Sequence, residues 1–197
     1  MNRRDALKNI SLGVGYTLAA PSILSLLQSC KSDVEAWVPI FLSLEEGVVL
    51  KNLVDLILPK TEDTPGALEV NVPEFIDLFM AKGENEEHQA ELRAGFASIM
   101  TALNIPEEDP SKLKTEDYDA LLAKYLKADK TQLEKFKTSE TDKLIFETLN
   151  YIRGKSIWAY KTSEFVGEKV LAYDPIPGPA KGCITVEEAT GGKAWSL

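Results

Sequence analysis

The chain has 197 residues and a formal net charge of −9, with 44% hydrophobic and 27% charged residues. This acidity argues against nucleic acid or an anionic membrane surface as a partner, because both carry negative phosphates. The sequence holds one histidine and two cysteines, and it lacks iron–sulfur and haem cysteine spacings, a GxGxxG fingerprint and a phosphate loop. A chain without cofactor or nucleophile signatures is more readily interpreted as a partner of an enzyme than as an enzyme.

The first 30 residues have the composition of an export signal, with a charged start, an apolar middle and a junction of small residues. Glycine, serine and proline interrupt the apolar run, so it is less hydrophobic than a membrane span of about 20 apolar residues. The start resembles the twin-arginine motif, which addresses folded proteins to export, although Asn2 and Ala6 depart from it. The residues that match the motif are Arg3, Arg4, Leu7 and Lys8.

The end of the signal, Leu27-Gln28-Ser29-Cys30, resembles a bacterial lipobox, in which the cysteine is lipidated and becomes the new N-terminus. Cleavage by an ordinary signal peptidase and an uncleaved membrane anchor are the alternatives. We therefore expect an exported, periplasmic protein that is tethered to the membrane through lipid at Cys30.

Removal of the signal leaves 167 residues, from 31 to 197, which is enough for one domain with a single core. The signal contains three of the 22 basic residues and one of the 31 acidic residues, so the net charge of the mature chain is −11. We expect a helical domain over 31–172 and an arm over 173–197.

Apolar residues recur at helical spacing through most of the body, and no segment has the alternation of a strand. Ser43 and Glu46 form a capping box ahead of a helix that ends at Pro59, and the segment 31–42 before it is expected to lie against the body. The remaining helices are predicted from Pro73, over 84–103, over 115–126, as a brief turn over 130–137, and as the longest helix over 139–171. The predicted fold is all-α, an irregular helical bundle with an extended, non-helical C-terminal arm.

Two segments have residues that could bind a metal. The loop 58–67 contains acids and hydroxyls but lacks calcium-loop spacing, which favours a structural loop built on proline and glycine. His88 lies among glutamates at helical spacing and could bind a metal with them, but the surrounding charges favour a solvated acidic face.

The arm cannot continue a helix, because prolines remove backbone donors and fix extended conformations. It ends in Trp195 and Leu197, which could anchor it on another protein or cover its own domain. If Cys30 carries lipid, Cys183 is an unpaired thiol in an oxidising compartment, which raises the possibility of an intermolecular bond. The alternatives are a buried, inert thiol or an internal disulfide between Cys30 and Cys183.

The twin-arginine signal and five later segments together resemble the gluconate 2-dehydrogenase subunit 3 family. The five segments are Ile57–Ala67, Val72–Asp77, Tyr173–Gly178, Lys181–Cys183 and Gly191–Leu197. The resemblance implies the small subunit of a bacterial flavin-dependent sugar or polyol dehydrogenase. The FAD and the catalytic base would belong to a large subunit of the glucose-methanol-choline oxidoreductase type, and a cytochrome c subunit often takes the electrons onward. This chain would then have no catalytic, cofactor-binding or metal-binding residues of its own.

The resemblance implies that the chain binds, stabilises and co-exports the large subunit, with Cys183 as a candidate for a covalent bond to it. The alternatives are an exported lipoprotein scaffold without an oxidoreductase partner and a small metal-dependent hydrolase that uses His88. The residues expected to bind the partner are Pro65, Gly66, Tyr173, Pro175, Pro177, Cys183, Trp195 and Leu197.

Overall fold

The computed structural model describes residues 37–105, 109–176, 178–179 and 182–196, and the elements below all belong to the unit Val38–Leu197. Within these residues the secondary structure is helical, and the sole β-type pairing is an isolated bridge between Ala172 and Trp195. The all-α prediction is confirmed. Some residues singled out in the sequence lie outside the described ranges: Arg3, Arg4, Leu7, Lys8, Cys30, Pro177 and Leu197.

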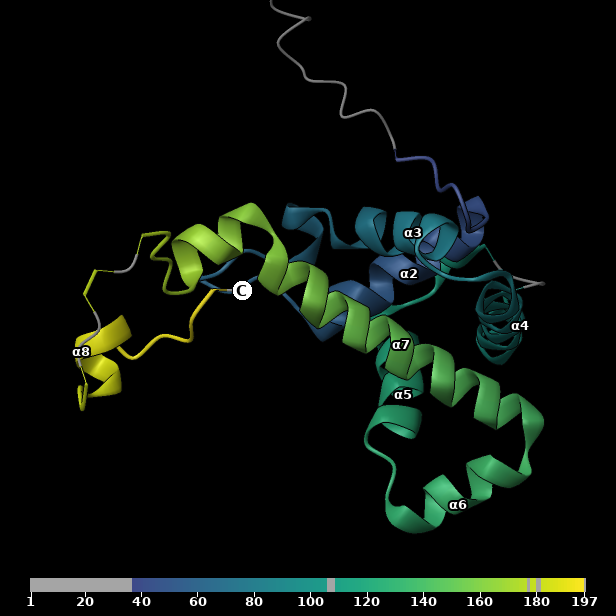
Figure 1. The fold of residues 1–197 in the computed structure, drawn as a ribbon. Coiled ribbons are helices and arrows are strands. Elements are labelled where there is room, and N and C mark those ends of the chain that lie inside the picture. Colours follow the sequence, from purple (N-terminus) through teal and green to yellow (C-terminus); the bar gives the residue numbers. More distant parts are fainter. Residues whose placement is uncertain (1–36, 106–108, 177, 180–181, 197) are drawn as a thin grey trace, which may run out of the picture. The chain divides into compact units, whose positions relative to one another are not determined.

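The helices follow the predicted order along the chain (Figure 1). No helix in the described ranges is both long enough and apolar enough to span a membrane. The α-helices are α2 (Leu44–Ile57), α3 (Val72–Lys82), α4 (Glu86–Ala102), α5 (Thr115–Leu126), α6 (Lys130–Thr138), α7 (Glu140–Thr162) and α8 (Val186–Thr190). Shorter turns are η1 (Ala67–Val70), η2 (Pro110–Lys112) and the π-helical η3 (Val166–Val170).

Helix α7 is the central element, and it packs against α2, α3, α4, α5 and α6 (Figure 1). Its buried stripe recurs at helical spacing and includes Ile145, Leu149 and Ile152, which are at most 1% exposed. At the crossing with α4, a Cβ atom on Gly95 would lie 1.8 Å from Oγ1 of Thr148. Glycine at position 95 therefore permits the close approach of the two helices.

The capping box that opens α2 is confirmed. The Glu46 backbone N–H donates to Oγ of Ser43 over 3.1 Å, and the Ser43 N–H donates to the Glu46 carboxylate over 2.8 Å. These two bonds satisfy donors that the first turn of a helix leaves unpaired. The helix then buries its apolar side through Val49, Leu50 and Leu53.

The buried carboxylate of Asp77 on α3 holds the chain that leads into α2. Its two oxygens accept backbone N–H groups from Ile40 at 2.6 Å, Phe41 at 3.0 Å and Leu42 at 2.9 Å. Asp77 is 1% exposed, so these three donors replace the water that a carboxylate needs. The expectation that the segment before α2 lies against the body is thus confirmed for residues 40–42.

The predicted longest helix is interrupted. Helix α7 ends at Thr162, because the Ser163 backbone turns to an extended conformation and its hydroxyl donates to the carbonyl of Tyr160 over 2.7 Å. A π-helical turn, η3, follows this break. Conversely, the brief turn predicted over 130–137 is the complete helix α6, since Asp129 and Gln132 cap its start reciprocally.

The prediction of a wholly non-helical arm is wrong over 186–190, where the chain forms α8. Thr185 and Glu188 form a capping box, and Gly191 ends the turn in the left-handed region at φ 62°. Local capping is strong enough to hold one helical turn despite the prolines that precede it.

Asp77→Asn is expected to destabilise the fold by about 2 kcal/mol, because an amide nitrogen would face backbone donors that the carboxylate now accepts. Chemical denaturation monitored by circular dichroism measures this loss. The matched control is Asp55→Asn on the exposed side of α2, which should change the free energy of unfolding little. Equal effects of the two substitutions would contradict the role assigned to Asp77.

Candidate partner-binding surface

The loop 58–67 is a structural loop, as the sequence favoured. The Ala67 N–H donates to the carbonyl of Leu58 over 2.9 Å and closes the loop at its base. At its tip, the backbone N–H of Thr64 donates to Oγ1 of Thr61 over 3.0 Å, and the backbone N–H of Thr61 donates to the carbonyl of Thr64 over the same distance. The hydroxyls and backbone groups thus satisfy one another inside the loop.

Gly66 is buried where the two sides of this loop meet. A Cβ atom there would lie 2.9 Å from the backbone nitrogen of Lys60, so a larger residue would push the two sides apart. The Gly66 N–H donates to the carboxylate of Glu69 over 3.0 Å. The Lys60 ammonium, and after it this N–H, lowers the pKa of Glu69 from its ordinary value.

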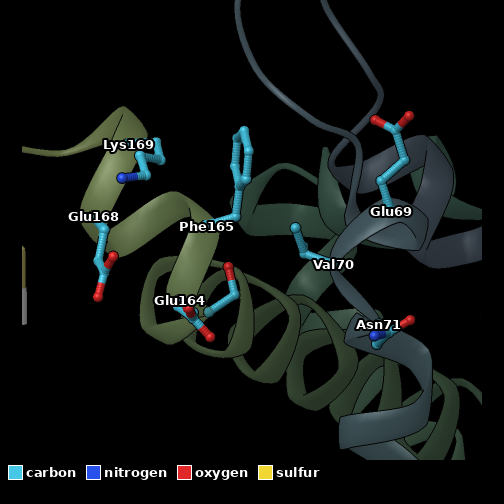
Figure 2. Close-up of a pocket in the computed structure, with 8 residues that line it drawn as sticks. Glu69, Val70, Asn71, Glu164, Phe165, Glu168 and Lys169 are labelled. Carbon is cyan, nitrogen blue, oxygen red and sulfur yellow. The ribbon is translucent and has the colours of Figure 1, made fainter.

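The end of α7 meets the loop. The hydroxyl of Tyr160 donates to the carbonyl of Pro65 over 2.8 Å, and this bond joins residues 95 positions apart. Just after the break at Ser163, Phe165 is 54% exposed, and its side chain stands out from the turn in Figure 2. The break in the helix is what brings this aromatic ring to the surface beside the loop.

Two adjoining hollows, of about 380 and about 430 Å³, have Phe165 in their lining. Both are lined by Glu69, Val70 and Phe165, and Figure 2 shows η1 and the turn after α7 facing each other across the first. We name their union the acidic groove. Its other lining residues are Lys60, Thr61, Glu62, Asp63, Thr64, Pro65, Asn71, Ser163, Glu164, Glu168 and Lys169.

The arm is fastened at its base. The Ala172 N–H donates to the carbonyl of Ala194 over 2.9 Å, and the Ser196 N–H donates to the carbonyl of Ala172 over 2.8 Å. The arm is therefore a closed loop whose end returns to its start, while its apolar side chains stay outside. The most exposed of these are Ile176 at 85% and Val186 at 67%.

The residues that the sequence singled out for partner binding divide between these two places. Pro65 lines the acidic groove and Gly66 supports its wall. Tyr173, Pro175 and Trp195 lie exposed on the arm, as does the free thiol of Cys183. The alternative of a buried Cys183 is thereby ruled out, and its bond to a partner stays a prediction.

His88 belongs to a hydrogen-bonded network centred on Glu84. Nδ1 of His88 lies 2.7 Å from one Glu84 oxygen, and the Tyr151 hydroxyl donates to the other over 2.9 Å. Lys155 adds its ammonium 3.6 Å from Glu84. These bonds make the network a polar contact between α7 and the segment that leads into α4. Among the described residues, no group of three histidine, cysteine or acidic side chains could hold a metal ion.

Burial acts on Glu84 against ionisation, but hydrogen bonds from His88 and Tyr151 outweigh it and lower the pKa of the carboxyl. Burial, reinforced by the same Glu84 carboxylate, raises the pKa of Tyr151. The network therefore holds one stable anion and one neutral phenol, which suits a structural contact.

Sequence reasoning missed Tyr160, Phe165 and Glu69. The apolar spacing after Thr162 continues that of α7, so Phe165 reads as a buried helix position. The only signal of a break was Ser163, a residue that favours helix ends. Nothing local could reveal that Tyr160 reaches Pro65, because the pairing exists only in the folded chain.

The fold defines a helical protein with a surface groove between a proline-glycine loop and the end of the central helix. The family model for gluconate 2-dehydrogenase subunit 3 matches residues 44–178, which is more than half of the chain. The chain belongs to this family. Membership implies a subunit of a gluconate 2-dehydrogenase complex that associates with a larger catalytic subunit.

The match covers all the lining residues of the acidic groove and ends at Gly178. Two segments that contributed to the resemblance, Lys181–Cys183 and Gly191–Leu197, lie beyond it. Neither the curated proteins nor the solved structures include a significant match to this chain.

Tyr160→Phe is expected to lower the stability by about 1 kcal/mol, because it leaves the Pro65 carbonyl without its donor. Amide hydrogen exchange over residues 61–69 should accelerate more than exchange in α4. Tyr173→Phe is the matched control, since Tyr173 is 51% exposed on the arm. Unchanged exchange in the loop would show that the bond does not hold it.

Glu84→Gln should make the free energy of unfolding depend less on pH at acidic pH. A carboxyl whose folded pKa lies below its ordinary 4.5 contributes stability above about pH 4.5 and loses it as the pH falls through the folded value. The difference between wild type and variant should therefore be largest near neutral pH and shrink below about pH 4.5. Urea denaturation across this range measures it, with Glu91→Gln on the exposed face of α4 as control.

Proposed function

We propose that this chain is the accessory subunit that binds, stabilises and co-exports the large catalytic subunit of a flavin-dependent sugar or polyol dehydrogenase. The observation that carries the proposal is the family match over residues 44–178, since this family is named for one subunit of a multi-subunit dehydrogenase. The single histidine and the lack of cofactor motifs in the sequence agree with an accessory role.

In the proposed complex, the chemistry is divided between chains. The partner is a flavoprotein of the glucose-methanol-choline type that holds FAD and the catalytic base, and a cytochrome c subunit receives the electrons. This chain supplies binding surface and an export address. Its acidic groove and its arm offer two exposed contact regions for the large subunit.

The proposed interface joins the loop of Pro65 and Gly66 to the exposed side chains of the arm. Aromatic and aliphatic side chains that are exposed in the free subunit are typical anchors of protein interfaces. Cys183 is free and exposed in the described structure, so it is accessible to a cysteine of the large subunit. The arm residues in this interface are Tyr173, Pro175, Pro177, Cys183, Trp195 and Leu197.

Export of the complex is proposed to use the twin-arginine signal of this chain, because a flavoprotein must fold around its cofactor before it crosses the membrane. Lipid at Cys30 would then tether the complex on the periplasmic side. One acyl chain binds a membrane marginally, whereas the several chains of a bacterial lipoprotein anchor hold firmly.

Replacing both signal arginines, Arg3→Lys together with Arg4→Lys, should leave the dehydrogenase activity of the co-expressed large subunit in the cytoplasm. Cell fractionation followed by a dye-linked dehydrogenase assay measures where the activity lies. The control is Arg153→Lys on the exposed face of α7, which makes the same chemical change outside the signal. Activity that still reaches the envelope with both lysines would contradict co-export.

A further inference from the structure

We propose that the acidic groove binds a basic segment of the catalytic subunit, with an arginine or lysine side chain placed over the ring of Phe165. This inference rests on the proposed function, because it takes the large subunit as the partner. It adds the chemistry by which the two chains recognise each other.

The lining of the groove carries an excess of negative charge. It contains five carboxylates and two lysines, and one lysine, Lys60, is already paired with Glu69. Within the part of the chain that the structure describes, the four other carboxylates form no ion pair, and all are exposed. These are Glu62, Asp63, Glu164 and Glu168, which are opposed by Lys169 alone.

An exposed aromatic ring lines both hollows. Phe165 is 54% exposed and lines both hollows, so side chains of an incoming segment can reach its ring. A cation over an aromatic face gains most when neighbouring carboxylates favour it and water is displaced. The same fold already stacks cations on phenylalanine, with Arg93 4.1 Å from the centre of the Phe41 ring and Lys155 3.6 Å from that of Phe79.

Hydrogen bonds hold both walls of the groove in place. One wall of the groove is fixed by the bond from Tyr160 to Pro65, and the other by the bond from Ser163 to the Tyr160 carbonyl. A surface that is already ordered loses little conformational entropy when a partner binds. The groove is therefore suited to receive an extended segment without rearranging.

The net negative charge of the chain also argues against a second copy of it as the occupant. The chain has a net charge of −9, and two acidic surfaces that meet repel each other. A basic segment of another protein gains from the same field, which favours its encounter and its register.

The test compares purified catalytic subunit binding to wild-type chain and to three variants. Two of them alter the groove, Glu164→Gln with Glu168→Gln and, separately, Phe165→Ala. The matched control, Glu116→Gln with Asp119→Asn, removes two exposed charges from α5 instead. Affinity is measured by calorimetric titration at about 0.05 M and about 0.3 M salt, concentrations at which screening differs strongly.

Each groove variant is expected to weaken binding about tenfold at low salt, whereas the control stays within about twofold of wild type. The charge variant should also lose most of the salt dependence that wild type shows. Thermal unfolding of each variant checks its fold. Should Phe165→Ala unfold, the exposed charge pair still decides the question.

The outcomes separate the two proposals. No complex with wild type at either salt concentration would contradict the proposed function itself. A wild-type complex whose affinity and salt dependence are unchanged in the folded groove variants would overturn the groove and leave the accessory role standing.

A photo-crosslinker placed at Phe165 identifies the occupant of the groove in the assembled complex. Capture of a catalytic-subunit peptide that contains arginine or lysine supports the proposal. Capture of an acidic peptide, of a purely apolar peptide or of a second copy of this chain overturns it, as does a formed complex that gives no crosslink.

Discussion

The buried stripe of α7 is the constraint on which the rest of the fold depends. Each helix from α2 to α6 packs against it, so this one helix contacts most of the core. The crossing with α4 is close, since it leaves no room for a Cβ atom on Gly95 opposite Thr148. Close packing of this kind leaves α4 and α7 little room to shift against each other.

The position of the acidic groove depends on the end of α7. The groove forms where α7 ends, because the break at Ser163 exposes Phe165 and the last full turn of the helix sends Tyr160 to the loop. One helix thus supplies both the core and one wall of the surface. Asp77 likewise fixes a segment to the helical body. Its carboxylate accepts the backbone N–H groups of residues 40–42 and so fastens them to α3. Polar contacts therefore fix one wall of the groove and residues 40–42 to the helical body.

The sequence predicted those parts of the fold that local chemistry decides. Capping at Ser43 and the apolar spacing of the body located the helices, and the proline-glycine loop was correctly interpreted as structural. It could not predict the parts that depend on distant residues. The end of α7 was missed because Phe165 and Val166 continue its apolar pattern, and the role of Asp77 was missed because its partners lie 35 to 37 positions earlier. In α8 the local capping of Thr185 outweighed the proline content from which an extended arm was predicted.

The family match assigns different significance to the two proposed contact regions. The acidic groove lies wholly within residues 44–178, whereas the arm beyond Gly178, with Cys183 and Trp195, lies outside. The groove thus lies in the part of the chain that the family model matches, and the family implies association with a larger catalytic subunit. The bonds at Ala172 join this outer segment to the end of the matched region, so the arm returns to the helical body beside the groove-bearing part of the chain.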